Sequence, residues 1–107
     1  MSIIYNFNTW KVSGNKAPQW SQKAYKLMRV NINKRGYTGE LLGAIMYLHF
    51  IKGMTVTQIR KAPTGYNLPS VHIRSIIKGT FSPDAFIIFM DMLETEPEIL
   101  DRLFRTY

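Results

Sequence analysis

The chain has 107 residues, a length that fits one domain with a single modest hydrophobic core. Its 46% hydrophobic and 20% charged residues exclude the intrinsically disordered class, and the lack of cysteine excludes disulfide scaffolds and thiolate metal sites. No signal-peptide pattern follows Met1, and the longest apolar stretch, residues 41–51, is too short to cross a membrane. We therefore expect a cytoplasmic globular domain that does not enter a membrane.

Charge is strongly segregated along the chain, which carries a net +7. Residues 1–80 hold twelve Lys and Arg against one acid, Glu40, whereas residues 81–107 hold two Arg against six acids. A basic body with an acidic C-terminal end favours a polyanionic partner on one side. A basic globular protein without such a partner has the same composition, so both interpretations stay open on charge alone.

The first 38 residues are predicted to form an N-terminal arm followed by a basic helix. Alternating apolar and polar residues over 3–8 predict a short strand or an extended arm, and residues 11–18 are typical of a loop. From Gln19 the spacing becomes helical, and "NKRGY" at 33–37 is expected to end that helix. Its apolar and basic faces consist, respectively, of Trp20, Ala24, Leu27 and Met28, and of Lys23, Lys26 and Arg29.

Residues 39–107 are predicted to form a helical core around one buried helix. Thr38 is expected to cap a helix over about 39–52, and Gly53 to end it. This helix is apolar on nearly every side, which predicts a central position in the core. His49, which lies within it, is expected to be a satisfied core or boundary residue. A short helix over 55–62 and a helix over about 68–78, closed by Gly79, follow.

Two C-terminal helices complete the predicted core. Ser82 is expected to cap the first, with Pro83 at its first position and Asp84 in its first turn. Thr95 and Glu98 have the spacing of a capping box at the start of the second, whose apolar face is Ile99, Leu100, Leu103 and Phe104. We thus expect a single all-α domain, a five- to six-helix bundle with a short N-terminal arm or strand.

The predicted helices at 55–62 and 68–78 each have one polar face. In the second, Ile73, Ile76 and Ile77 point toward the core and His72 lies at the border, which leaves outside Ser70, Val71, Arg74, Ser75 and Lys78. These are side chains that a helix uses to contact bases in the major groove. In the first, Val56 and Ile59 point inward, and the residues left to contact phosphates are Thr57, Gln58, Arg60 and Lys61. Ordinary solvated helix faces remain the alternative for both.

The order of these features resembles a known family. The chain carries, in sequence, "TVTQIRKA" at 55–62, Gly65, "IRSIIKG" at 73–79, "SP" at 82–83 and "AFIIFMDML" at 85–93. This order is similar to that of lambda-repressor-like helix-turn-helix domains, and the resemblance covers about residues 39–105. It implies five helices and double-stranded DNA binding, usually by a dimer. It also implies base reading by Ser70, Val71, Arg74 and Ser75, with Gln58 near the DNA backbone.

One spacing departs from the family pattern. From Ile59 to Ile73 the chain runs 14 residues, where the compact motif has about 11. The segment "APTGYNLPS" is therefore longer than a compact turn, and Pro69 is expected in the first turn of the recognition helix.

The resulting hypothesis is a sequence-specific transcriptional regulator, such as a repressor, of bacterial, phage or plasmid type. We expect a homodimer through the C-terminal helices, because one helix face cannot hide the six consecutive apolar residues at 85–90. We expect no enzyme, cofactor, metal or small-molecule substrate, because the sequence shows no metal-ligand spacing, no phosphate-binding glycine loop and no triad arrangement.

Two other functions stay open. A protein-binding module of phage or plasmid type could hold a host protein through the apolar helix at "AFIIFM". RNA binding could use aromatic and basic residues near the N-terminus, namely Tyr5, Phe7, Trp10, Trp20, Lys11, Lys16 and Lys23.

Overall fold

The structure is a computed structural model that describes residues 21–65 and 68–107. These residues contain a 3-10 turn, η1 (Pro63–Gly65), and six α-helices: α2 (Gln22–Met28), α3 (Gly39–Phe50), α4 (Val56–Lys61), α5 (Ser70–Lys78), α6 (Pro83–Thr95) and α7 (Pro97–Phe104). The described part of the chain has no strand, which confirms the predicted all-α class. The strand or arm predicted at 3–8 lies outside the described residues.

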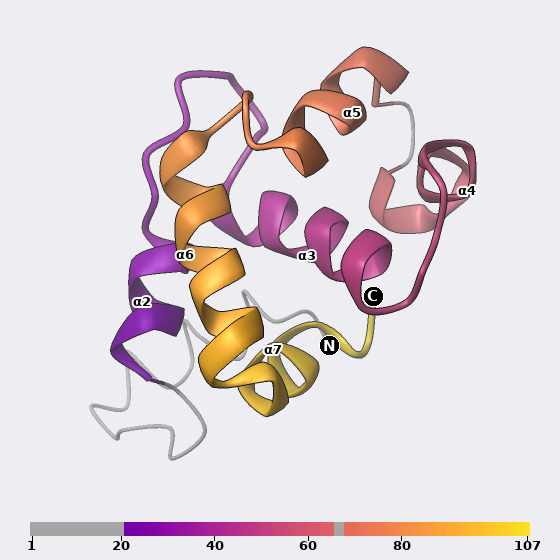
Figure 1. Ribbon diagram of the computed structural model, residues 1–107. Coiled ribbons are helices and arrows are strands. Elements are labelled where there is room, and N and C mark those ends of the chain that lie inside the picture. The colour runs from indigo at the N-terminus through magenta and orange to yellow at the C-terminus, as the bar shows by residue number, and fades with distance from the viewer. Residues whose placement is uncertain (1–20, 66–67) are drawn as a thin grey trace.

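Helix α3 is the buried centre of the fold, as predicted (Figure 1). Each of the other five described helices packs against it. Thr38 caps it by accepting the Leu41 N–H on its hydroxyl oxygen at 3.1 Å, and the chain leaves it through Gly53, whose φ is +73°. His49 near its end shares a 2.9 Å hydrogen bond with the Met54 carbonyl, so it is a satisfied boundary residue, as predicted.

Two glycines let neighbouring helices approach α3 closely. A β-carbon at Gly39 would collide with the Leu27 carbonyl at the end of α2. A β-carbon at Gly43 would lie 2.6 Å from the Phe104 ring of α7, closer than real β-carbons come. Because these positions carry no side chain, α2 and α7 can both rest directly on the α3 backbone.

Helix α2 is shorter than its sequence pattern predicted. It begins after Ser21, whose hydroxyl oxygen accepts the Ala24 N–H at 3.2 Å, and it ends at Met28 rather than near residue 33. The chain turns after Met28 because Val30 and Ile32 pack against the core, which a continued helix would not allow. Ala24 and Leu27 are fully buried, so the predicted apolar face is confirmed for the described residues.

Polar contacts fix the start of α2 to the corner between α6 and α7. The Ser21 hydroxyl donates a 2.6 Å hydrogen bond to Glu96. Lys23 forms a 2.9 Å ion pair with Asp91 and donates to the Thr95 hydroxyl. The hydrogen bond with Asp91 raises the pKa of Lys23. Together, these contacts join α2, the first described helix, to α6 and to Glu96 at the start of α7.

The start of α7 differs from the prediction. Thr95 is the last residue of α6, and its hydroxyl donates to the Asp91 carbonyl at 2.8 Å. Glu96 occupies the N-cap position without a side-chain capping bond, so the predicted capping box of Thr95 and Glu98 is wrong. The reason is that α6 runs farther than expected, and Pro97 begins the next helix after one intervening residue. By contrast, Ser82 caps α6 as predicted.

Tyr47 connects α3 to α7 by a hydrogen bond from a buried position. Its hydroxyl donates to Asp101 at 2.6 Å. Burial, followed by this hydrogen bond, raises the pKa of Tyr47 to about 12. Since the folded-state value exceeds the usual value of 10, the stability linked to this proton is complete below pH 10 and is lost as pH rises toward 12.

We expect Tyr47→Phe to lower the free energy of unfolding by about 0.5–1.5 kcal/mol at neutral pH, because one hydrogen bond is removed. Urea denaturation followed by circular dichroism measures the change. Between pH 10 and about 12 the difference from the wild type should shrink, because the wild type alone loses the contribution of the Tyr47 proton. A difference that stays constant over this range would contradict the assignment.

Candidate nucleic-acid interface

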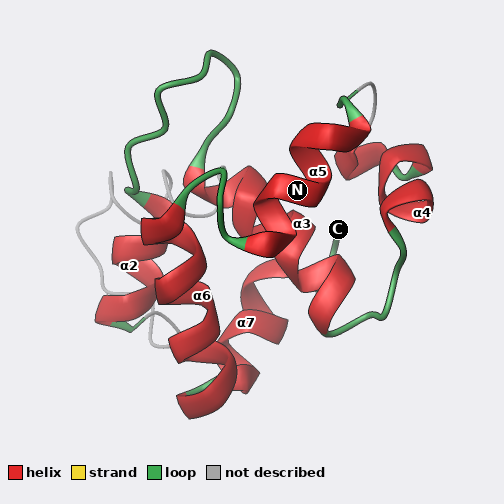
Figure 2. Ribbon diagram, turned by 45° about the horizontal axis from the view of Figure 1, so that its top comes forward, coloured by secondary structure: helices red, strands yellow, loops and turns green. Residues whose placement is uncertain are grey.

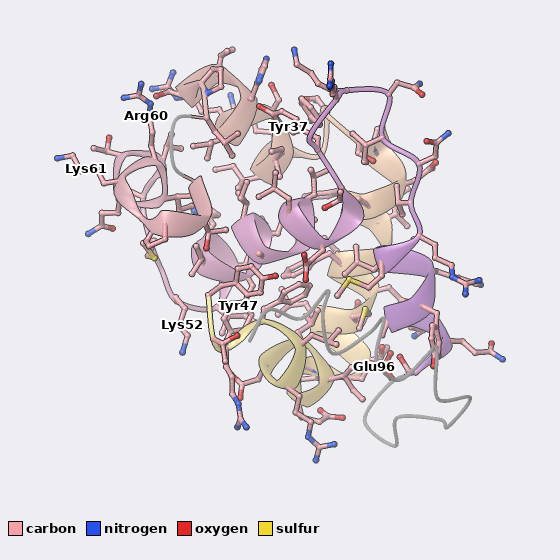
Figure 3. All side chains as sticks on the ribbon, turned by 180° about the vertical axis from the view of Figure 1, so that it is seen from behind. Tyr37, Tyr47, Lys52, Arg60, Lys61 and Glu96 are labelled. Carbon is pink, nitrogen blue, oxygen red and sulfur yellow. The ribbon has the colours of Figure 1, made fainter. Side chains whose placement is uncertain are left out.

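The charges of the described residues separate onto two regions of the molecule. No acidic residue occurs between residues 41 and 83, the stretch that contains α4 and α5. All acids except the buried Glu40 lie in α6, in α7 or at Glu96 between them. Figure 3 shows Arg60 and Lys61 at one edge of the molecule, well apart from Glu96. Because α4, α5 and the loop over 29–38 contain basic residues and no acid, we call the surface that they form the basic side.

Helix α5 presents a narrow polar face to solvent. Ile73 and Ile76 are buried against the core, which confirms the predicted inward side. On the opposite side Arg74 and Lys78 are exposed, and Val71 is one of two large hydrophobic side chains that remain exposed in the described residues, at 61%. A ligand that approaches this face meets a guanidinium group, an ammonium group and an isopropyl group.

The two serines that were predicted for this face are less accessible to a ligand than Val71, Arg74 and Lys78 are. Ser70 and Ser75 are half-buried, and the Ser75 hydroxyl donates to the Val71 carbonyl of its own helix at 2.8 Å. The helix also begins two residues later than predicted. Pro69 is its N-cap, with an extended ψ of 137°, so the expectation that Pro69 lies in the first turn is wrong. The extended ψ keeps Pro69 outside the helix. Gly79 closes α5 in a left-handed conformation, as predicted.

Helix α4 exposes all four of its predicted contact residues, but two of them are engaged. The Gln58 side-chain oxygen accepts the Thr55 N–H at 2.9 Å, and the Thr55 hydroxyl accepts the Gln58 N–H, which completes a capping box. Arg60 donates from Nε to the Leu68 carbonyl at 3.1 Å. Thr57 and Lys61 are exposed and have no such internal bond among the described residues.

The connection between α4 and α5 is longer than a compact turn. It runs over residues 62–69 and contains the 3-10 turn η1, whereas compact helix-turn-helix motifs use about three or four residues. Gly65 is buried in it, and a β-carbon there would collide with the Ile59 carbonyl of α4. The loop thus folds back onto α4, and both α4 and α5 still pack against α3.

The loop that connects α2 to α3 adds a third element to the basic side, and helix periodicity did not indicate its position. Tyr37 in this loop shares a 2.8 Å hydrogen bond with His72 Nδ1 of α5 and stacks on Phe81, with ring centroids 5.1 Å apart. Burial raises the pKa of Tyr37. Figure 2 shows the loop on the same side of the molecule as α5. As a result, Lys34 and Arg35 extend the positive charge beside α5.

Neither a metal centre nor a membrane span is present in the described residues. They contain no group of His, Cys, Asp and Glu that could hold a metal ion. Their helices are all too short or too polar to cross a membrane. No protein-family model, curated protein sequence or solved structure matches the chain significantly, so the resemblance to lambda-repressor-like domains stays a prediction.

The neighbours Arg60 and Lys61 offer a matched test of the contacts in α4. We expect Arg60→Ala to lower the free energy of unfolding by about 0.5–1.5 kcal/mol, because the hydrogen bond to the Leu68 carbonyl is lost. Lys61→Ala should change it by less than about 0.5 kcal/mol, as exposed substitutions usually do. Denaturant unfolding of both variants measures the difference, and equal losses would show that Arg60 does not hold the loop.

Proposed function

We propose that the protein is a sequence-specific regulator of transcription that binds double-stranded DNA by inserting α5 into the major groove. One observation carries the proposal: the exposed face of α5, with Val71, Arg74 and Lys78, lies between cations supplied by α4 and by the loop over 29–38. The five helices α3 to α7 equal in number the five that the resemblance to lambda-repressor-like domains implies. Such a role would place the protein in the cytoplasm of a bacterial source, or of a host that carries phage or plasmid DNA.

The chemistry of the face suits base reading. The Arg74 guanidinium can donate to both acceptors of one guanine, and the Val71 side chain can contact a thymine methyl group. Lys78 lies one turn beyond Arg74 and can reach a second guanine or a phosphate. In α4, Thr57 and Lys61 are available to contact the DNA backbone, while Arg60 retains its two terminal nitrogens for such a contact after bonding Leu68.

DNA binding should depend steeply on salt and should distinguish Arg74 from Lys61. Each phosphate that a cation neutralises releases counterions, so affinity should fall by orders of magnitude between low and moderate salt. Arg74→Ala should cost about 1–3 kcal/mol on a selected site and relax the preference at one base pair. Lys61→Ala should weaken the selected and a scrambled duplex equally and make the salt slope shallower by about one unit.

Electrophoretic mobility shifts at several salt concentrations, on both duplexes, provide the measurement. Arg74→Lys serves as a control, because it keeps the charge but loses the forked contact, and it should recover little of the selectivity. Equal losses on both duplexes for Arg74→Ala would show that α5 does not read bases. No binding of the wild type at low salt would refute the proposal.

The contact of the proposed homodimer would centre on one exposed apolar side chain, that of Ile87. Within the apolar run at 85–90, Ala85 and Phe89 are buried, three further residues are partly buried, and Ile87 is 64% exposed. Ile87 lines a groove of about 560 Å³ between α2 and α6. Lys26 and Arg29 lie on the α2 side of this groove and Asp84 lies on the α6 side. Because cations and an acid lie beside Ile87 in one groove, the same surface on two copies can be self-complementary.

We expect Ile87→Asp to abolish self-association, because a carboxylate would have to be buried in the contact. Val71→Asp provides the matched control, since it changes the other exposed large hydrophobic side chain and should leave the dimer intact. Sedimentation at tens of micromolar protein measures both. A wild type that stays monomeric with and without DNA would contradict the dimer. The same groove would then favour the second candidate function, a module that binds another protein through α6.

The RNA-binding alternative gains no support from the described residues. Most of its aromatic and basic residues lie before residue 21, outside the described part. Lys23, which is described, is engaged with Asp91 and Thr95 and is not available to a nucleic acid without breaking both contacts.

A further inference from the structure

His72 lies in a network that the proposed base-reading residues do not use. Its Nδ1 is 2.8 Å from the Tyr37 hydroxyl oxygen, and its Nε2 is 3.5 Å from Lys34 Nζ. The Phe81 ring packs against the rings of both His72 and Tyr37. These contacts fix the orientation of the imidazole, so that Nε2 points to the ammonium group of Lys34 at the edge of α5.

The protons of this network can be assigned from the groups present. An ammonium group has only hydrogens to donate, so Nε2 must accept in the contact with Lys34. The single proton of the neutral imidazole then lies on Nδ1 and is donated to the Tyr37 hydroxyl oxygen. If His72 gains a proton, Nε2–H and the Lys34 ammonium become two positively charged donors that face each other.

An anion between these two donors would relieve their repulsion. A phosphodiester oxygen can accept from both at once, and charge-assisted hydrogen bonds of this kind are the stronger type. One acid, Asp84, lines a hollow together with Lys34 and Phe81 but forms no ion pair with Lys34. The other titratable neighbour in the network is Tyr37, which stays neutral at physiological pH. The two donors therefore lack an anionic partner within this part of the described chain.

We infer that Lys34 and His72 form a phosphate-binding pair that takes a DNA backbone phosphate beside α5, with uptake of one proton by His72. This inference rests on the proposed DNA binding. It adds a DNA contact made by residues other than those proposed in α4 and on the exposed face of α5. It makes DNA affinity depend on pH in a defined direction. Because the protonated ring binds the phosphate, affinity should rise as pH falls through the range in which histidines titrate.

The test uses the full chain, a short random-sequence duplex and constant ionic strength, at pH about 7.5 and about 5.5. Wild-type affinity should be roughly three- to tenfold higher at the lower pH, because the duplex binds the protonated ring more tightly than the neutral one. The salt slope should be steeper there by up to about one unit, because one more cation contacts a phosphate.

Two histidine variants separate the site from general effects of pH. His72→Gln cannot be protonated and should bind with the same affinity at both pH values. His49→Gln is the matched control, since the chain has only these two histidines and His49 is bonded to the Met54 carbonyl instead. It should keep the wild-type response. Lys34→Gln should make the salt slope shallower by about one unit at the higher pH.

The outcomes distinguish this inference from the proposed function. If duplex DNA binds but His72→Gln retains the wild-type pH response, the phosphate-binding pair is refuted while DNA binding stands. If no duplex binds at low salt at either pH, both fail. A nuclear magnetic resonance titration of the wild-type histidine ring signals is independent of any variant. At a fixed pH, addition of duplex should move the His72 ring signals toward those of the protonated ring and leave the His49 signals in place, and unmoved His72 signals would overturn the inference.

Discussion

The burial of α3 on every side is the constraint on which the rest of the fold depends. Its aliphatic side chains are enclosed by five other helices, and each one contributes roughly 1.5–3 kcal/mol relative to an exposed position. A helix enclosed in this way leaves little room for its neighbours, and Gly39 and Gly43 provide that room where α2 and α7 cross it. The position of α5, and with it the exposed Arg74, follows from how Ile73 and Ile76 fit against this same helix.

Local signals in the sequence were sufficient to predict a helix boundary where a single residue decides it. Thr38 and Ser82 cap α3 and α6 by direct hydrogen bonds, and Gly53 and Gly79 end α3 and α5 with positive φ. The predicted boundary was wrong where it depends on packing against residues far away in the sequence. Val30 and Ile32 end α2 early by turning to the core, and the length of α6 removes Thr95 from the capping position.

The candidate interface likewise contains residues that the sequence predicted and contacts that it did not. Periodicity placed Val71, Arg74 and Lys78 correctly on the outward face of α5, because three Ile residues mark the inward side. It could not show that Gln58 and Arg60 bond to their own backbone surroundings, since both are exposed and polar. It also missed the loop over 29–38. The contact between Tyr37 and His72 joins residues 35 positions apart, and no local pattern encodes such a pair.

The attachment of α2 has a consequence for the order in which the protein folds and opens. Helices α3 to α7 pack mainly against sequence neighbours or the central helix, whereas Ser21 meets Glu96 across 75 residues. Closing so long a loop costs more entropy than the other pairings, and the seven-residue helix buries only Ala24 and Leu27 in return. Helix α2 should dock after the others and detach before them. Its amide hydrogens should then exchange with solvent at a lower free energy than those of α3, through a local opening that leaves α5 folded.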